Sequence, residues 1–118
     1  MLRAYVVDDE PLARDELKYL LARSREVEVL GESDSIEDAL QDIVLLRPDI
    51  VFLDIELAGE NGLNLAARLE DISPVPAIVF ATAYDEYALQ AFEVNAADYL
   101  LKPFSEERIH KTISKIKN

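Results

Sequence analysis

Residues 50 to 54 read Ile50-Val51-Phe52-Leu53-Asp54, which is four consecutive apolar side chains followed directly by a carboxylate. A short, unbroken apolar run is typical of a strand that is covered on both faces, as in parallel sheets. Four further runs lie on either side of it along the chain: Leu2–Val7, Val27–Leu30, Ala77–Ala81 and Tyr99–Leu101. The Val27–Leu30 run, which follows Glu26, alternates with acidic residues, so we expect this strand at an edge of the sheet with one face in water.

Between these runs, apolar residues recur at helical spacing. The expected helices contain Ala13–Leu21, Ile36–Val44, Leu65–Ile72, Tyr84–Ala91 and Ile109–Ile116. Ser35 and Ser105 are the expected N-caps of the second and fifth helices. Strand and helix therefore alternate five times, which indicates βαβ units with right-handed crossovers. We predict an α/β fold, a flavodoxin-like three-layer αβα sandwich around a doubly wound, five-stranded parallel sheet with the order 2-1-3-4-5. We expect Phe52, Phe80 and Phe92 in its core.

Length and composition restrict the function. A chain of 118 residues, 50% hydrophobic and 31% charged, predicts one globular domain over residues 1–118. It has no cysteine, and its one histidine, His110, excludes a multi-histidine metal site and weakens any Ser-His-Asp triad. With 12 Lys and Arg against 24 Asp and Glu, the net charge is −12, so we expect no direct contact with nucleic acid or anionic membranes.

The chain also lacks the segments that direct proteins to membranes. No apolar run approaches the ~20 residues that a membrane-spanning helix needs. Met1 leads directly into the first expected strand, with no signal peptide before it. We therefore expect a cytoplasmic protein.

Polar residues follow four of the five expected strands. They are Asp8, Asp9 and Glu10 after the first, Asp54 and Glu56 after the third, Thr82 after the fourth, and Lys102, which is followed by Pro103, after the fifth. In doubly wound sheets, ligands bind outside the carboxyl ends of the strands, so these residues should face one crevice.

Three carboxylates, those of Asp8, Asp9 and Asp54, are expected within a few ångströms of one another. Two like charges about 4 Å apart repel by roughly 4 kcal/mol at an effective dielectric constant of about 20, unless a cation lies between them. Oxygen ligands without His or Cys select a hard cation, and a small open cluster favours Mg²⁺, with Mn²⁺ as the alternative, over Ca²⁺. The other interpretation of Asp8-Asp9-Glu10 is a turn and helix N-cap before Pro11, which can coexist with metal binding.

Asp54 carries the chemistry that we expect at this crevice. A carboxylate can act as a nucleophile toward phosphorus and form an aspartyl phosphate. Transfer then needs in-line positioning and positive charge on the phosphoryl oxygens, which Lys102 would supply, while Thr82 offers a hydroxyl donor. Taken singly, these would be an ordinary loop lysine and an ordinary strand-end hydroxyl. Gly59 and Gly62 match no nucleotide-binding motif, and we interpret them as turn residues.

Four motifs together resemble the receiver domain of bacterial response regulators, the partners of sensor histidine kinases. They are Val7–Pro11, Pro48–Ile55, Ala81–Ala83 and Asp98–Phe104, and the resemblance spans essentially all 118 residues. The stretches Thr82–Ala88 and Ala91–Ala96 are similar to the LytR/AlgR subclass. Most members of that subclass are transcription factors with a separate DNA-binding domain, which this chain does not contain.

The resemblance implies roles for the residues around the crevice. Asp54 matches the phosphoacceptor and Lys102 the phosphate-binding lysine. Asp9 matches the direct Mg²⁺ ligand, Asp8 a ligand acting through water, and the backbone carbonyl of Glu56 the third protein ligand. Such a domain catalyses only its own phosphorylation and dephosphorylation, so we do not expect an enzyme.

The resemblance also implies a switch. Thr82 and Tyr99 match the switch pair, and the Lys102–Pro103 peptide bond matches one that is cis in the family. Phosphorylation would change the face formed by the fourth helix, fifth strand and fifth helix, where a homodimer could form. Glu56 and Tyr84 lie at positions that vary in the family and are implicated in the dephosphorylation rate.

Three other interpretations are open from the sequence. The chain could be a stand-alone receiver that acts by protein contact alone. An aspartate-nucleophile phosphatase would carry D-x-D after its first strand, where this chain has Asp8-Asp9. A flavin binder would need a hydroxyl-rich and amide-rich phosphate loop there, and the acidic residues would repel the flavin phosphate.

Overall fold

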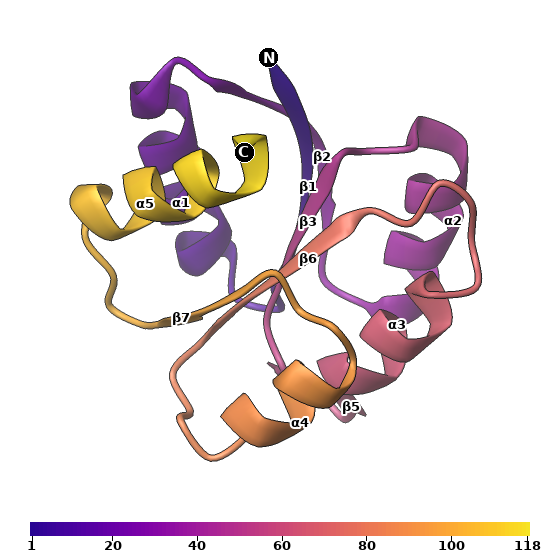
Figure 1. Cartoon of the computed structure of the whole chain (residues 1–118). Coiled ribbons are helices and arrows are strands. Elements are labelled where there is room, and N and C mark those ends of the chain that lie inside the picture. Colours follow the sequence, from indigo (N-terminus) through magenta and orange to yellow (C-terminus); the bar gives the residue numbers. More distant parts are fainter.

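A five-stranded parallel sheet forms the middle of the computed structural model, which describes residues 1–118. Its strands are β1 (Leu2–Val7), β2 (Val27–Ser33), β3 (Ile50–Leu53), β6 (Ala77–Thr82) and β7 (Asp98–Leu101). They lie in the order β2-β1-β3-β6-β7, and every neighbouring pair is parallel (Figure 1). Counted along the chain, this is the order 2-1-3-4-5, so the predicted topology is confirmed. β2 is an edge strand, as its alternating sequence indicated.

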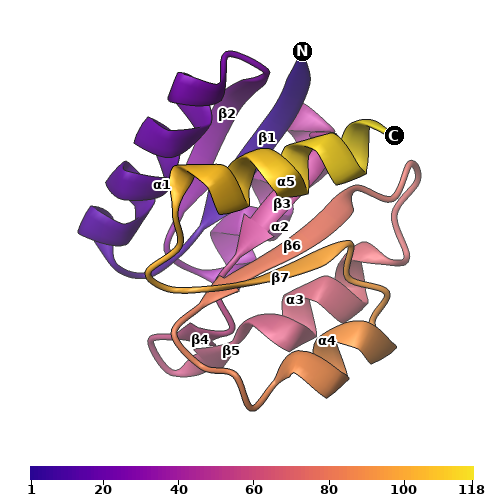
Figure 2. The same ribbon diagram turned by 60° about the vertical axis from the view of Figure 1, so that its left-hand side comes forward.

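Helices cover both faces of the sheet (Figures 1 and 2). α1 (Pro11–Ser24) and α5 (Glu106–Lys117) lie on one face, and α2 (Ile36–Leu46), α3 (Gly62–Leu69) and α4 (Ala88–Glu93) lie on the other. Successive residues of a strand point to opposite faces, so Phe52 packs with the first pair of helices and Leu53 with the other three. The predicted three-layer sandwich is therefore confirmed.

The helix starts follow the predicted capping chemistry. The Ser35 hydroxyl accepts a hydrogen bond from the Asp38 N–H, and the Ser105 hydroxyl accepts one from the Arg108 N–H. Each bond satisfies one backbone donor that the first turn of a helix leaves free. Both predicted N-caps are confirmed.

Two helices differ from the predicted ranges. α3 ends at Leu69, before Ile72, and α4 begins at Ala88, so Tyr84 and Tyr87 precede it. Phe92 was expected in the core, and this prediction is wrong, because its side chain is 78% exposed. Adjacent positions on a helix point about 100° apart, and it is Ala91 that faces the core.

A two-stranded hairpin follows β3 and was not predicted. It consists of β4 (Glu56–Leu57) and β5 (Glu60–Asn61), which pair antiparallel. Gly59 in its turn has φ of +72°, a conformation that glycine adopts without strain, so its role as a turn residue is confirmed. The hairpin anchors itself by burying Leu57 in the core.

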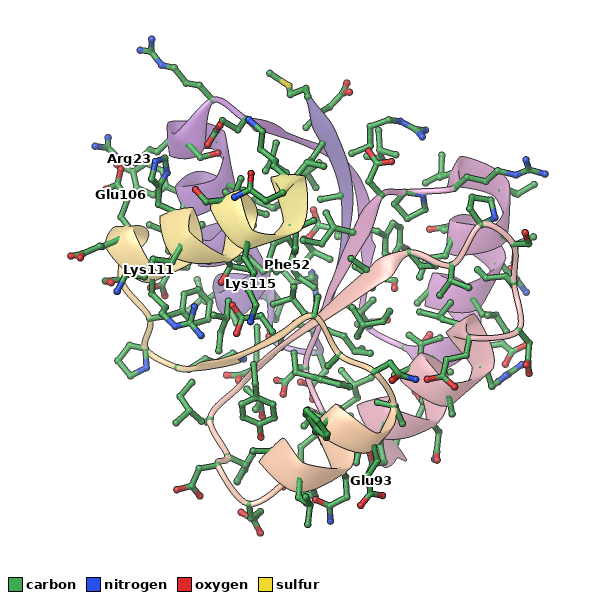
Figure 3. The ribbon with its side chains drawn as sticks, viewed as in Figure 1. Arg23, Phe52, Glu93, Glu106, Lys111 and Lys115 are labelled. Carbon is green, nitrogen blue, oxygen red and sulfur yellow. The ribbon has the colours of Figure 1, made fainter.

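Ion pairs join α5 to α1 and to the segment that follows α1. In Figure 3 the side chains of Arg23 and Glu106 point toward one another, and Arg23 Nε lies 3.1 Å from Glu106 Oε1. Lys117 Nζ lies 2.6 Å from Glu26 Oε1, at the other end of α5. None of the helices combines the length and the apolar character that crossing a bilayer requires.

Candidate phosphoryl-acceptor and metal site

Three strand ends bring two carboxylates and one ammonium group into contact. Asp8 follows β1 and Asp54 follows β3, and both residues are only 5% exposed. Lys102 follows β7, and its Nζ donates to Asp8 Oδ2 at 2.7 Å and to Asp54 Oδ2 at 3.0 Å. Residues that are 48 and 94 positions apart in the chain thus meet at the carboxyl edge of the sheet.

The second oxygen of each carboxylate faces its own loop. Asp8 Oδ1 accepts the Glu10 N–H at 3.0 Å, and Asp54 Oδ1 accepts the Glu56 N–H at 3.3 Å. The Asp8 contact forms a turn before α1, as one interpretation of these acids expected. The N-cap is Glu10, directly before Pro11, so the expected N-cap position is confirmed, although the Glu10 side chain makes no capping hydrogen bond.

The charges in this pocket do not balance. Burial raises the pKa of Asp54, and the nearby Asp8 carboxylate raises it further. The contacts with Lys102 and the Thr82 hydroxyl lower it, but the net shift of the pKa is upward. Burial lowers the pKa of Lys102, but its contacts with Asp8 and Asp54 outweigh burial and raise it, so the ammonium stays charged. One ammonium shared by two carboxylates leaves room for a second cation.

The chemistry of the donor atoms fits a hard cation. Carboxylate oxygens of Asp8, Asp9 and Glu10 all lie within 4.8 Å of one another, and Asp9 is half-buried while Glu10 is exposed. Every available ligand atom is an oxygen, which suits Mg²⁺ or Mn²⁺ and excludes the softer metals that prefer Cys or His. The acidic cluster expected after the first strand is therefore present.

The hydroxyl groups of Thr82 and Tyr99 both contact the backbone of Tyr84. Thr82 is fully buried at the end of β6, and its Oγ1 accepts the Tyr84 N–H at 3.4 Å. The Tyr99 hydroxyl donates to the Tyr84 carbonyl, while the Tyr99 ring lies 6.2 Å from the ring of Phe80. The Lys102–Pro103 peptide bond, directly after β7, is cis.

Two residues near the pocket were missed from the sequence. A Cβ on Gly62 would lie 2.2 Å from the Asp54 carbonyl oxygen, so Gly62 allows a close backbone approach and its interpretation as a turn residue is wrong. Arg14 donates from Nη1 to the Asp8 carbonyl at 2.6 Å and from Nε to Glu32 at 2.8 Å. The i+6 spacing of Arg14 from Asp8 carries no recognisable signal, and the glycine contact exists only in three dimensions.

Comparison with known proteins agrees with this fold and shows the family. Residues 4–114 match the model of the response regulator receiver domain, and the chain belongs to this family. The response regulatory domain of protein mrkE from Klebsiella pneumoniae superposes with a TM-score of 0.91 at 36% identity, covering 98% of this chain and 95% of that one. The receiver domain of the putative response regulator NarL from Mycobacterium tuberculosis gives a TM-score of 0.89 at 32% identity, over 99% and 97% of the two chains.

Relatives of known sequence point to a subclass of this family. The chain is 63% identical over 117 residues to the sensory transduction protein LytT of Bacillus cereus, covering 99% of this chain and 48% of LytT. It is 45% identical over 116 residues to the transcriptional regulatory protein LytR of Staphylococcus aureus, covering 98% and 47%. These names agree with the LytR/AlgR-type motifs. The chain spans about half the length of these curated relatives.

Proposed function

We propose that Asp54 is the phosphoacceptor of this receiver domain and takes its phosphoryl group from a phosphohistidine of a sensor histidine kinase. An Asp54 carboxylate oxygen would form the new O–P bond while the P–N bond to the imidazole breaks. The observation that supports this best is the Lys102 ammonium group, which binds Asp54 and Asp8 together at 3.0 and 2.7 Å. The kinase uses ATP as its phosphate source, so the proposal places the protein in the cytoplasm.

The surroundings of Asp54 favour it as the nucleophile. Its carboxylate is buried and has a raised pKa, so burial and Asp8 make its charged form less stable than that of an exposed aspartate. Lys102 is placed to neutralise the charge on the transferred group, and charge-assisted bonds of this kind are the strong ones. Catalysis here consists of positioning and charge neutralisation, without a separate general base.

The groups that we propose would hold Mg²⁺ are Asp8, Asp9, Asp54 and the backbone carbonyl of Glu56. When bound, the ion would supply further positive charge for the phosphoryl oxygens. The neighbouring residues prepare the ligands, because Arg14 holds the Asp8 backbone and the Glu56 N–H binds Asp54.

The Tyr84 backbone connects the proposed switch pair. Phosphorylation would add a charge of about −1.5 to −2 beside Thr82, whose hydroxyl would turn to donate to the new oxygens. The contact between Thr82 and the Tyr84 N–H would then be lost, and Tyr99 is bonded to the carbonyl of the same residue. A shift from 1:99 to 99:1 between two such packings needs about 5.5 kcal/mol of differential stabilisation.

The output face would be that of α4, β7 and α5. It exposes large apolar side chains, with Leu89 69%, Phe92 78% and Leu101 45% exposed. Exposed apolar side chains gathered on neighbouring elements indicate a contact surface. We propose that phosphorylation changes dimerisation through this face and thereby controls an effector, by analogy with the transcriptional regulators among the longer relatives.

Labelling tests the assignment of Asp54. Wild type incubated with Mg²⁺ and radioactive acetyl phosphate, or with a phosphorylated kinase, should approach one phosphoryl group per chain. Asp54→Ala should take up none, while Asp71→Ala, which removes an exposed acid, should label like wild type. Full labelling of Asp54→Ala would remove the assignment.

The same proposal predicts no multiple turnover. Within the lifetime of one phosphorylated Asp54, an excess of a phosphomonoester such as p-nitrophenyl phosphate should yield no more product than one equivalent per chain. Sustained hydrolysis that Asp54→Ala abolishes would favour the phosphatase interpretation instead.

A further inference from the structure

A hydrogen bond joins the loop behind the phosphoacceptor to the start of α4. The Tyr87 hydroxyl donates to Glu56 Oε2 at 3.1 Å, across 31 positions of sequence. Glu56 opens the β4–β5 hairpin and Tyr87 is the N-cap residue of α4. The hairpin lies beside α4 in Figure 1, and Glu56 and Tyr87 line the same hollow.

The two ends of Glu56 face different partners. Its backbone N–H donates to Asp54 Oδ1 at 3.3 Å, and its side chain extends to Tyr87. Glu56 and Tyr87 line a hollow between the hairpin and α3, together with Glu60 and Arg68. Asp54, Asp8 and Lys102 do not line this hollow. The Glu56 carboxylate therefore opens onto a surface separate from the phosphoacceptor pocket, although it belongs to a residue that touches Asp54.

Tyr87 is itself held in place. Its half-buried side chain packs against the core cluster beneath α2, α3 and α4. The ring of Tyr84 meets it edge to face, with the ring centres 6.4 Å apart. Glu56, by contrast, is exposed and has no hydrogen bond or ion pair through its side chain other than the one from Tyr87. A fixed hydroxyl thus restrains an otherwise free carboxylate.

We propose that Tyr87 is a positioning residue whose hydroxyl holds the Glu56 carboxylate at the start of α4 and keeps its charge out of the phosphoacceptor pocket. The inference rests on the proposed function of Asp54. That pocket already has two carboxylates for one ammonium group, and a phosphoryl donor is an anion. A third carboxylate turning toward the pocket would repel the donor.

The test is the rate of labelling by acetyl phosphate, measured for wild type, Tyr87→Phe and the control Tyr19→Phe, which removes an exposed hydroxyl on α1. Without the hydroxyl, Glu56 can turn toward the pocket. One added charge at about 8 Å in water slows association about twofold to threefold. We therefore expect Tyr87→Phe to lower the second-order rate constant by that factor in low salt, and to approach wild type at about 0.5 M salt, where screening is strong. Tyr19→Phe should match wild type throughout.

A variant without the charge of Glu56 distinguishes electrostatic repulsion of the donor from a loss of structure in Tyr87→Phe. In a Glu56→Gln background, Tyr87→Phe should change the rate constant by less than the scatter between replicates. Equal rates for wild type and Tyr87→Phe in low salt would overturn the inference, as would a loss that persists with Gln at position 56 or at high salt. Absence of labelling in wild type would instead contradict the proposed function.

Discussion

Asp54 follows β3 and Asp98 is the first residue of β7, and little of either side chain is exposed, yet their surroundings differ in the number of donors. The side chain of Asp98, 10% exposed, accepts from both terminal nitrogens of Arg108 at 2.9 and 3.0 Å and from the Thr112 hydroxyl at 2.7 Å. It also accepts the Tyr99 N–H at 2.8 Å. The side chain of Asp54, 7% exposed, shares one ammonium group with Asp8.

The pKa values of the two residues shift in opposite directions for this reason. Burial tends to raise the pKa of Asp98, but hydrogen bonds from Arg108 and Thr112 outweigh it and lower the pKa to about 2. Burial also raises the pKa of Asp54, and there the donors do not outweigh it. The Asp98 carboxylate has enough hydrogen-bond donors to hold its charge, and it stabilises the packing of α5 on β7. The Asp54 carboxylate has too few donors and is left able to react.

Gly62→Ala should have the largest effect, and it acts on the backbone that carries the Asp54 carboxylate, not on the surroundings of Asp98. Its Cβ would meet the Asp54 carbonyl oxygen at 2.2 Å, and backbone cannot give way as a flexible side chain would. We expect a loss of about 3 kcal/mol in the free energy of unfolding, measured in urea, together with slower labelling of Asp54. Asn64→Ala, an exposed change in the same helix, should stay within about 0.5 kcal/mol of wild type. An unchanged unfolding free energy for Gly62→Ala would contradict the close contact.

Asp98→Asn removes the charge that Arg108 and Thr112 bind. It should lower the free energy of unfolding by about 2 kcal/mol at pH 7, because the lowered pKa of Asp98 corresponds to that stabilisation. A lowered pKa gives stability that is present above the ordinary pKa and lost as the pH falls from about 4 to about 2. The difference between wild type and Asp98→Asn should therefore shrink over that window in urea titrations. Asp71→Asn is the control, and a gap that stays constant down to pH 2 would show that the charge of Asp98 is not responsible.

Mg²⁺ should stabilise the protein through the acidic residues around Asp54 and not through the contacts of Asp98. A ligand of the folded state at ten times its Kd adds about 1.4 kcal/mol. We expect this increase in wild type and in Asp98→Asn, and a much smaller one in Asp9→Ala, when Tm is followed during addition of Mg²⁺. A Tm of wild type that does not respond to Mg²⁺ would argue against the metal site.

Asp54→Asn should have the smallest effect, and it should raise the free energy of unfolding where the other substitutions lower it. Asp54→Asn removes a charge that burial and Asp8 disfavour, and leaves Lys102 its contact with Asp8. At pH 7 without divalent ions we expect a gain of about 1 kcal/mol in unfolding free energy, the usual size when a functional site is neutralised. If Asp54→Asn lost stability as Asp98→Asn should, the contrast between the two carboxylates would not hold.

The sequence predicted the features that depend on chain order and periodicity. Ile50–Leu53 and the other apolar runs mark the strands, and the alternation with helices yields the sheet order, which places Asp8, Asp54 and Lys102 at one edge. The direction in which a side chain points could not be predicted from the sequence. Phe92 lies one position from the buried Ala91 and points outward.

The remaining differences need contacts between distant segments. Arg108 and Thr112 lie on one face of α5, but nothing in their spacing names Asp98 as the partner. Gly62 looks like any loop glycine until the Asp54 backbone is placed against it. The contact from Tyr87 to Glu56 likewise follows only from the position of the hairpin beside α4.

The bridge that Lys102 makes between Asp8 and Asp54 means that the pocket already contains its own counter-ion, fixed to the chain. A metal ion that bound here would share the Asp8 and Asp54 carboxylates with this ammonium group, so its affinity would depend on the negative charge that Lys102 leaves unneutralised. Because Lys102 directly precedes the loop into α5, the same two contacts also fix the start of that loop to the ends of β1 and β3.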